Sequence, residues 1–223
     1  MIPPDRDWDS IFDDLRLRIA GEGLPSVSQV AADNPRDPFR VLISTMISLR
    51  TRDDVTFAAS GRLFRRAGAP REMAALSEEE IAALIFPAGF YRTKAVHIRE
   101  AARVIHETWK DRIPPDRDLL MTLPGVGRKT ANLVLNLGFG IDAVCVDTHV
   151  HRIANRTGWV RTKTPEETET ALEEILPKRY WIAVNGLLVS YGKAVCTPLS
   201  PRCGSCPLFS SRCERRGVGR SRD

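Results

Sequence analysis

Apolar side chains recur through most of the chain at the three- and four-residue spacing of an α-helix. Residues 8–19, 39–47 and 95–109 carry the clearest stretches, and the alternation typical of β-strands is nearly absent. The apolar run 141–146 lacks helical spacing, follows two glycines and precedes Asp147, so we expect a buried connector there. The pattern therefore predicts an all-α fold of roughly ten helices.

Polar residues mark where several of these helices begin. Ser77 and Asp116 precede apolar patterns and are expected N-caps, because their side chains can accept hydrogen bonds from the first free N–H groups of a helix. Thr164 is followed by a proline, which is favoured at the first helical position. Asp147 is expected to cap a further helix that ends near Gly158.

The chain's 223 residues are enough for one large domain or two smaller ones. With 43% hydrophobic and 27% charged residues, it has the composition of a folded, soluble protein. No stretch approaches the ~18 consecutive apolar residues that span a membrane. The amino terminus lacks the basic-then-apolar pattern of a signal peptide. We therefore expect a cytoplasmic protein, whose thiols stay reduced.

Positive charge is concentrated at the carboxyl terminus. The chain has a net charge of +5, and residues 196–223 contribute +4 of it through six arginines and two acidic residues. A basic tail on a nearly neutral body is typical of a protein with a polyanionic partner. It is equally consistent with a solvated tail that keeps the protein in solution, and charge alone leaves both interpretations open.

Four of the five cysteines fall in one short window, which indicates a metal or cluster site in a reducing compartment. Cys196, Cys203, Cys206 and Cys213 have the spacing C-x6-C-x2-C-x6-C. Four thiolates can hold Zn²⁺ or a [4Fe–4S] cluster. Zinc ribbons usually carry two close pairs and this window has one, so the spacing favours the cluster slightly. Cys145, in the connector, is expected to be a small buried core residue.

The segment Leu123–Thr130 reads Leu-Pro-Gly-Val-Gly-Arg-Lys-Thr and lies between two short helical patterns. Its glycines permit a tight turn, and the second helix then starts with unpaired N–H groups that suit a phosphate. A P-loop is excluded because an arginine follows the second glycine and a helix precedes the segment. An ordinary turn between helices stays as an alternative. The expected phosphate-contacting residues are Gly125, Val126, Gly127, Arg128 and Thr130.

Lys129 stands in the first turn of that second helix, in a chain with only six lysines against 27 arginines. Arginine would serve a phosphate contact as well or better, whereas the lysine amine can become neutral and nucleophilic. The helix dipole and partial burial both favour the neutral form, which can attack a sugar carbon and form a Schiff base. The alternative is an exposed lysine at a helix end.

Asp147 has the setting of a fixed carboxylate, because backbone N–H groups hold an N-cap side chain in place. Such a carboxylate at the edge of a pocket can accept a proton from Lys129 and stabilise an oxocarbenium-like sugar. The alternative is a cap without a chemical role. His149 and His151 are two residues apart and face different directions on a helix, so a shared metal is not expected.

These segments together resemble the endonuclease III family of helix-hairpin-helix DNA glycosylases, which carry an iron–sulfur cluster. The likeness is carried by Leu-Pro-Gly-Val-Gly-Arg-Lys-Thr-Ala-Asn at 123–132, Val-Asp-Thr-His-Val-His-Arg-Ile-Ala-Asn-Arg-Thr at 146–157, Ala-Gly-Phe-Tyr-Arg-Thr-Lys-Ala at 88–95 and the four clustered cysteines. It covers residues 39–213, most of the chain, and the combination of motifs is highly specific.

The resemblance implies a bifunctional DNA glycosylase and abasic-site lyase of base-excision repair, with Lys129 as the Schiff-base nucleophile and Asp147 as its partner carboxylate. It implies removal of oxidised or ring-saturated pyrimidines after base flipping, followed by β-elimination. It also implies two helical lobes. A helical barrel with the hairpin would span residues 30–141, and an iron–sulfur cluster domain would combine 1–29 with 142–223. The four cysteines would hold a structural [4Fe–4S] cluster.

Two positions depart from the family pattern. Arg50 stands where the family often has glutamine, and we expect it to wedge into the base stack; the alternative is a surface arginine. Met121 stands where glutamate is frequent, and both departures bear on lesion preference. His149 and Arg202 are expected to contact DNA. The last cysteine gap is one residue longer than is usual in the family.

The expected partner is damaged double-stranded DNA, bound by a monomer without a membrane or a nucleotide cofactor, and associated with the nucleoid if the source is bacterial. Three other functions stay open at this point. They are a thymine or uracil mismatch glycosylase on the same fold, a non-catalytic duplex-binding module, and a zinc-dependent regulator built on the cysteines.

Overall fold

The computed structural model describes residues 6–209 and 211–222, so the signal-peptide expectation falls largely on residues outside the described ones. Twelve α-helices account for most of the described chain, and its only β-structure is an isolated bridge between Arg202 and Arg222. The predicted all-α class is confirmed. No helix among the described residues has the length and apolar character needed to cross a membrane.

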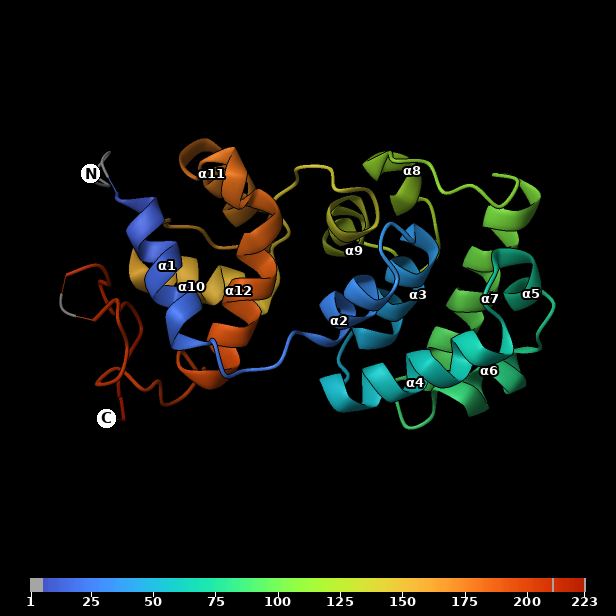
Figure 1. Cartoon of the computed structure of the whole chain (residues 1–223), viewed down its shortest axis with the longest axis horizontal. Coiled ribbons are helices and arrows are strands. Elements are labelled where there is room, and N and C mark those ends of the chain that lie inside the picture. Colours follow the sequence, from blue (N-terminus) through green and yellow to red (C-terminus); the bar gives the residue numbers. More distant parts are fainter. Residues whose placement is uncertain (1–5, 210, 223) are drawn as a thin grey trace. The chain divides into compact units, whose positions relative to one another are not determined.

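The described chain divides into two compact units, each of which is helical (Figure 1). The central unit is Pro25–Ala143. The terminal unit combines the described residues up to Leu24 with those from Val144 onward. The helices of the central unit are α2 (Ser26–Asp33), α3 (Pro38–Ser48), α4 (Asp53–Arg66), α5 (Pro70–Ala74), α6 (Glu78–Ile85), α7 (Tyr91–Glu107), α8 (Arg117–Met121) and α9 (Arg128–Leu133). Those of the terminal unit are α1 (Trp8–Arg18), α10 (Thr148–Thr157), α11 (Pro165–Ile175) and α12 (Trp181–Ala194).

The unit boundaries differ by a few residues from those predicted near residues 29 and 141. At the first boundary, α2 buries Val27 and Val30 and packs against α3, so it belongs to the central unit. At the second, the Asn136 side chain exchanges two hydrogen bonds with the backbone of Ala143, at 2.9 and 3.1 Å. These two buried hydrogen bonds hold Ala143, and with it the first part of the connector, in the central unit.

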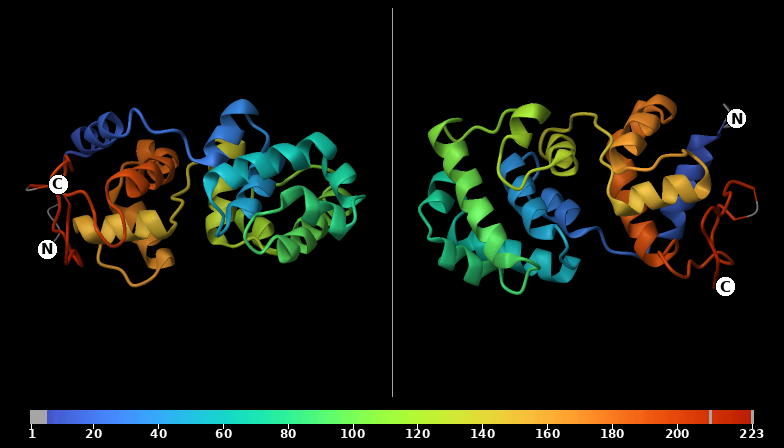
Figure 2. Two further views of the ribbon diagram at one scale, coloured as in Figure 1. Left: turned by 90° about the horizontal axis from the view of Figure 1, so that it is seen from below. Right: turned by 180° about the vertical axis from the view of Figure 1, so that it is seen from behind.

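The core of the central unit forms around α3, because α3 is apolar on nearly every side. Its residues 39, 41–43, 46 and 47 are all buried. It packs against α2, α4, α7 and a π-helical segment, Val134–Phe139. The long α7 lies beside α5 and α6 and also contacts α3 (Figure 2).

The core of the terminal unit joins the two ends of the chain. The Phe12 ring of α1 stacks on Tyr180 with 3.9 Å between ring centroids. The Trp8 ring meets Trp159 edge to face at 5.2 Å. Aliphatic residues of α10 and α12 complete the same cluster. The amino-terminal helix therefore fills a core made mostly by residues more than a hundred positions away in the sequence.

The predicted helix starts are confirmed, and three helical features were missed. Ser77, Asp116, Asp147 and Thr164 each accept a backbone N–H at the start of a helix, and α10 ends at a left-handed Gly158. The short α2 and α5 were not predicted. The helix predicted after the hairpin turn is an α-helix only from Arg128 to Leu133 and then widens into the π-helical segment.

Candidate active site and nucleic-acid interface

The hairpin turn between α8 and α9 has a backbone that its glycines make possible. Gly125 is left-handed with φ +76°, and a Cβ at that position would lie 2.7 Å from Nδ1 of His97. Val126 is buried, and its N–H donates to the Leu123 carbonyl at 3.1 Å. Gly127 then serves as the N-cap of α9 without a side chain of its own. The turn therefore presents bare backbone to solvent while α7 supports it from behind.

Lys129 is the second residue of α9 and is half-buried. Thr130 and Ala131, which follow it, are 2% and 0% exposed, so the helix is anchored in the core next to the lysine. Lys129 keeps part of its surface accessible on a helix that is fixed in place. Because Thr130 is buried, its predicted contact with DNA reduces to its backbone N–H.

Asp147 caps α10 as predicted, through a single carboxylate oxygen. Its Oδ1 accepts the N–H groups of His149 at 2.8 Å and of Val150 at 2.9 Å. Neither bond uses Oδ2. The side chain is half-buried, and its charge acts on the guanidinium of Arg152 one turn further along the helix. The structure thus gives Asp147 a fixed orientation with one oxygen left for other partners.

The two histidines of α10 point to different neighbours, as their spacing predicted. The Nδ1 atom of His149 lies 3.1 Å from Nη2 of Arg152, and the close approach of α12 at Gly192 leaves no room there for a Cβ. His151 instead places Nδ1 2.7 Å from the Thr168 hydroxyl. The predicted DNA contact of His149 stays a prediction.

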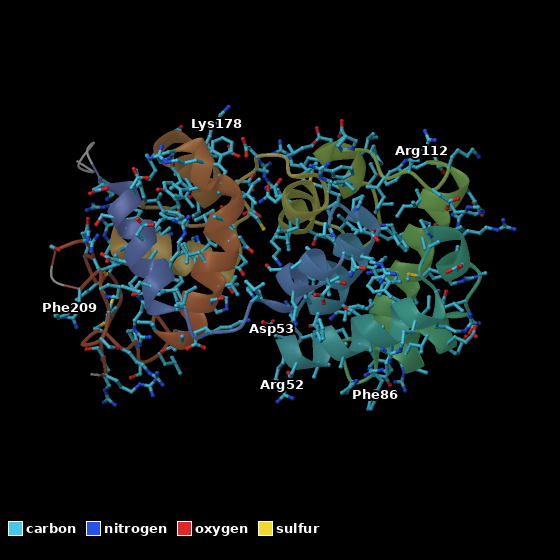
Figure 3. The ribbon with its side chains drawn as sticks, viewed as in Figure 1. Arg52, Asp53, Phe86, Arg112, Lys178 and Phe209 are labelled. Atoms are coloured by element: carbon cyan, nitrogen blue, oxygen red, sulfur yellow. The ribbon has the colours of Figure 1, made fainter. Side chains whose placement is uncertain are left out.

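Arg50 lies on an exposed loop between α3 and α4, in the central unit. It is a non-glycine residue with a left-handed backbone, φ +52°, and its guanidinium carbon lies 5.6 Å from the ring centroid of Phe90. Phe90 is 64% exposed and is also left-handed, at φ +56°. The neighbouring Arg52 points outward as well (Figure 3). Sequence reasoning predicted Arg50 here but missed Phe90.

Lys94, at the start of α7, is a second functional candidate that the sequence reasoning missed. It is only 7% exposed, and burial lowers its pKa from 10.5 to about 8. Its amine donates to the carbonyls of Ile47 and Leu49 and to the Thr51 hydroxyl. The sequence did indicate that Lys94 is buried, because it lies four residues before Ile98 and therefore on the apolar face of the helix.

The four clustered cysteines lie in a loop with polar neighbours. Tyr191 places its hydroxyl 2.8 Å from Cys206 Sγ, and Arg156 donates to Cys196 Sγ at 3.4 Å. Burial raises the pKa of Cys213 to about 11, and the charges of the thiols Cys206, Cys196 and Cys203 add to the increase. Among the described residues, no group of three or more His, Cys, Asp or Glu side chains is arranged to hold a metal ion.

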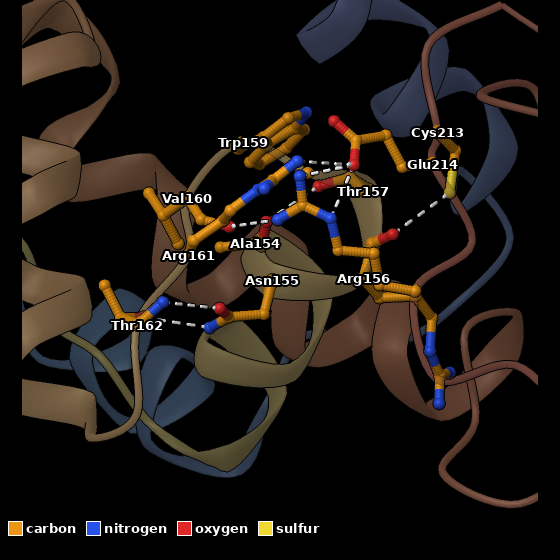
Figure 4. A network of polar contacts seen from close by, with 12 residues as sticks. Ala154, Asn155, Arg156, Thr157, Trp159, Val160, Arg161, Thr162, Cys213 and Glu214 are labelled. Carbon is orange, nitrogen blue, oxygen red and sulfur yellow. Dashed lines mark hydrogen bonds and ion pairs between the residues drawn. The ribbon is translucent and has the colours of Figure 1, made fainter. Parts of the chain in front are cut away.

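Arginines hold this loop by donating to its backbone carbonyls. Arg156 is 7% exposed and donates to Thr197 and Pro198 at 2.8 and 2.9 Å. Arg152 donates to the Cys196 carbonyl, and the Arg156 carbonyl in turn lies 3.7 Å from Cys213 Sγ (Figure 4). Phe209 projects from the loop (Figure 3), with Arg215 over its ring.

A groove of about 740 Å³ runs along α10 on the terminal unit. Its lining includes five cationic side chains, but three of them, Arg152, Arg156 and Arg216, are committed to backbone carbonyls. The lining also includes Asn155, which exchanges hydrogen bonds with Thr162 (Figure 4). The positive charge of this groove therefore serves mainly to hold neighbouring backbone.

Arg202 is exposed, and it contacts Val195 and Arg222 through its backbone. Its N–H donates to the Val195 carbonyl at 2.9 Å, and it pairs with Arg222 in the isolated bridge. The predicted phosphate contact of its guanidinium stays a prediction. The predicted site residues thus fall in both units, with Lys129, the hairpin and Arg50 in the central unit. Asp147, His149, Arg202 and the four cysteines lie in the terminal unit.

Comparison with known proteins shows which family the chain belongs to. Residues 43–178 match the model of the HhH-GPD superfamily of base excision DNA repair proteins. Endonuclease III of Thermotoga maritima is 50% identical over 84% of this chain and 89% of its own length. A solved non-covalent endonuclease III–DNA complex superposes with a TM-score of 0.83 at 32% identity, covering 96% of this chain and 97% of that one.

A second solved structure, a trapped endonuclease III–DNA covalent intermediate, is 34% identical with a TM-score of 0.76. The match covers 85% of this chain and 92% of that chain. The family model matches more than half of the chain, and the Thermotoga relative is covered almost in full. The chain therefore belongs to the endonuclease III family within the HhH-GPD superfamily.

Proposed function

We propose that this chain is a bifunctional DNA glycosylase and abasic-site lyase that removes oxidised or ring-saturated pyrimidines from double-stranded DNA. The observation that carries the proposal is the presence, in one endonuclease III family chain, of both a lysine on an anchored hairpin helix and a backbone-fixed aspartate. The similarity to a protein whose DNA complex was trapped as a covalent intermediate supports a nucleophilic mechanism.

The hairpin supplies the contact that is independent of base sequence. Gly125 and Gly127 are exposed, so a phosphate can approach the N–H groups at the start of α9 without meeting side chains. Arg128 adds positive charge beside them. Val126 and Thr130 are buried and would contribute through the backbone alone. Such contacts fix the position of a duplex without reading its sequence.

Base removal requires the damaged nucleotide to leave the stack, which costs about a few kcal/mol and less for a poorly stacked base. We expect Arg50 to fill the space that the flipped base leaves, with the exposed Phe90 beside it. His149 and Arg202 would contact the backbone nearby. The departures at Arg50 and Met121 would then alter which lesions are preferred and leave the reaction type unchanged.

The chemistry uses one amine and one carboxylate. Uncharged Lys129 Nζ attacks C1′ of the extruded deoxyribose, and the base leaves with the electron pair of the glycosidic bond and takes up a proton. Asp147 accepts the proton that the amine loses and stabilises positive charge on the sugar. The electron pair of the nitrogen then forms a C=N bond to C1′ as the C1′–O4′ ring bond breaks, and O4′ takes up a proton, which gives the protonated imine. C2′ of this imine loses a proton, a C2′–C3′ double bond forms, and the C3′–O bond breaks as the 3′ phosphate leaves with its electron pair. Water then hydrolyses the C=N bond and releases Lys129. No net oxidation or reduction occurs.

Cys196, Cys203, Cys206 and Cys213 would hold a [4Fe–4S] cluster. The donor set fits, because four thiols in one loop supply the four sulfur ligands that such a cluster takes. Arg156 and Tyr191 add donors near two of the sulfur atoms. When bound, the cluster would supply structural cross-linking, and the proposed reaction uses the side chains of Lys129 and Asp147 alone.

Borohydride reduction tests the proposal directly. The wild-type protein should cleave an abasic duplex and, with borohydride present, become covalently attached to it. Lys129→Gln should lower strand cleavage at least about 10³-fold and abolish trapping, while duplex binding stays near the wild-type value. Lys110→Gln, an exposed lysine elsewhere in the central unit, should behave like wild type. Normal cleavage without any trapped adduct would contradict the Schiff-base step.

Turnover on a panel of duplexes tests the substrate class. We expect release of thymine glycol and dihydrouracil, with strand cleavage after each. Faster turnover of uracil or mismatched thymine would assign the chain to mismatch repair on the same fold. Equal binding to every duplex without turnover would instead indicate a duplex-binding module.

A further inference from the structure

Lys94 is a buried charged residue, at 7% exposure, that the proposed reaction does not use. All three of its N–H donors converge on one short segment. They reach the carbonyls of Ile47 at 2.6 Å and Leu49 at 2.5 Å, and the Thr51 hydroxyl at 2.8 Å. The ammonium also stands at the carboxyl-terminal end of α3, where positive charge is favoured. All three hydrogen bonds of the Lys94 amine are therefore made to the end of α3 and to the loop that follows it.

Thr51 and Gly89 complete this contact from both sides. The Thr51 hydroxyl lies 3.3 Å from the Leu49 carbonyl, to which it donates, and it accepts the Gly89 N–H at 3.1 Å. A Cβ on Gly89 would lie 2.4 Å from the Arg50 carbonyl oxygen, so a side chain there would push the loop away. Lys94, Thr51 and Gly89 thus hold the backbone on either side of Arg50.

The backbone conformation of Arg50 is left-handed, which is unfavourable for a residue with a Cβ. Arg50 and Phe90 are both left-handed residues with a Cβ, and they lie next to each other with the guanidinium over the ring. Left-handed conformations of this kind are disfavoured and persist where the surrounding structure fixes them. The hydrogen bonds of Lys94 and Thr51 supply that constraint, because they secure the residues immediately before and after Arg50.

We infer that Lys94 is a positioning residue that holds the loop Leu49–Arg52 so that Arg50 is presented to duplex DNA in its left-handed conformation. The inference rests on the proposed function, because it assigns Lys94 a role in DNA engagement through Arg50. The competing explanation is that Lys94 only stabilises the central unit. The two explanations differ in whether its removal affects all substrates alike.

Substrates that differ in their need for base displacement separate these explanations. Lys94→Met keeps the apolar stem and removes all three donors. We expect kcat/KM to fall about 10- to 100-fold for a duplex with a paired lesion, and to change little for a single-stranded oligonucleotide with one abasic site. Lys110→Met removes an exposed lysine in the turn just after the same helix, whose amine donates to the Glu107 carbonyl, and should leave both rates unchanged.

A double-mutant cycle tests whether Lys94 acts through Arg50. Arg50→Ala should slow the duplex substrate by itself, and adding Lys94→Met to it should then cost less than about threefold. Full additivity of the two substitutions, or a wild-type rate for Arg50→Ala beside a slow Lys94→Met, would overturn the inference. So would an equal loss on the duplex and the single-stranded substrate.

Thr51→Val provides a milder variant if Lys94→Met folds poorly. It keeps the shape of the side chain and removes the hydroxyl that links Lys94 to Gly89. We expect the same selectivity for the duplex substrate with a smaller loss, of about three- to tenfold. An unchanged duplex rate would overturn the inference. A wild-type protein that cleaves neither substrate would instead reject the proposed function, so the two failures remain distinguishable.

Discussion

Both units fix a loop by directing cationic side chains at backbone carbonyls, but they use different residues to do so. In the central unit, one lysine, Lys94, gathers two carbonyls and a hydroxyl around a single nitrogen. In the terminal unit, Arg156 and Arg152 reach carbonyls spread along the cysteine loop. A lysine amine suits acceptors that converge on a point, whereas the planar guanidinium spans acceptors that lie apart.

This difference changes the interpretation of the basic carboxyl terminus. Its surplus charge indicated either a polyanionic partner or a solvated tail. The structure shows a third use, because Arg216 and Arg222 donate to the carbonyls of Val160 and Ser200. A loop with few apolar side chains is held by such donors and, in our proposal, by the cluster. The central unit instead has an apolar helix through its middle.

The largest expected effect follows from removing one cluster ligand. Cys206→Ser should abolish the brown colour that the proposed cluster would give and unfold the terminal unit, because structural metal groups contribute folding free energy directly. Tryptophan fluorescence reports mainly this unit, since Trp8, Trp159 and Trp181 belong to it and only Trp109 belongs to the central unit. Cys145→Ala is the matched control and should stay coloured. A colourless but fully folded Cys206→Ser protein would contradict the cross-linking role.

Paired core substitutions test whether the two units unfold separately. Leu15 in the terminal unit and Leu42 in the central unit are both 0% exposed. Replacing either with alanine should lower the free energy of unfolding of its own unit by about 2–5 kcal/mol. Urea titrations followed by fluorescence should shift with Leu15→Ala, and helical circular dichroism should reveal the transition that shifts with Leu42→Ala. Identical shifts in both signals would show one cooperative unit instead.

Removing a carbonyl-bound arginine should have a smaller effect. Arg156→Met leaves the carbonyls of Thr197 and Pro198 without their charged donor and should cost about 1–3 kcal/mol in the unfolding free energy of the terminal unit. Arg161→Met is the control, because Arg161 is 72% exposed and lies 3.8 Å from Glu214. It should change stability by no more than about 0.5 kcal/mol. Equal losses would mean that surface charge, rather than the carbonyl contacts, stabilises the loop.

What could be predicted from the sequence was what is encoded locally. Ser77 and Asp147 cap helices through contacts two or three residues away, and the spacing of apolar residues indicated most of the long helices. The short α2 and α5 were missed because both lack a side-chain cap. Lys94 was missed because its acceptors lie 43 to 47 residues earlier in the chain, and nothing near it in sequence indicates them.

The candidate site divides along the same line. The hairpin glycines and Lys129 are adjacent in sequence, so their type and spacing predicted the motif. The left-handed backbone of Arg50 could not be predicted, since it depends on contacts that only the folded chain creates, the hydrogen bonds of Lys94 and Thr51 and the close approach of Gly89 to the Arg50 carbonyl. The residues proposed to do the chemistry were visible in the sequence, whereas Lys94, proposed to position Arg50, was not.

The smallest expected effect concerns the charge on Lys94, and it distinguishes the lysine from the arginines of the terminal unit. Burial lowers the pKa of Lys94 to about 8 in the folded protein, against 10.5 when exposed. Between these values the unfolded chain binds more protons, so the free energy of unfolding rises with pH in that window. The cost of burying the charge is fully present below pH 8 and is relieved toward pH 10.5.

Urea unfolding of the wild type and Lys94→Met at pH 7.5, 9 and 10 isolates this contribution. The stability of the wild type relative to the variant should increase by on the order of 1 kcal/mol across the series. Arg156→Met should show no such trend relative to wild type, because a guanidinium stays protonated throughout this range. A flat difference for Lys94→Met would mean that its amine titrates as if exposed, and the burial that fixes the Arg50 loop would then be overstated.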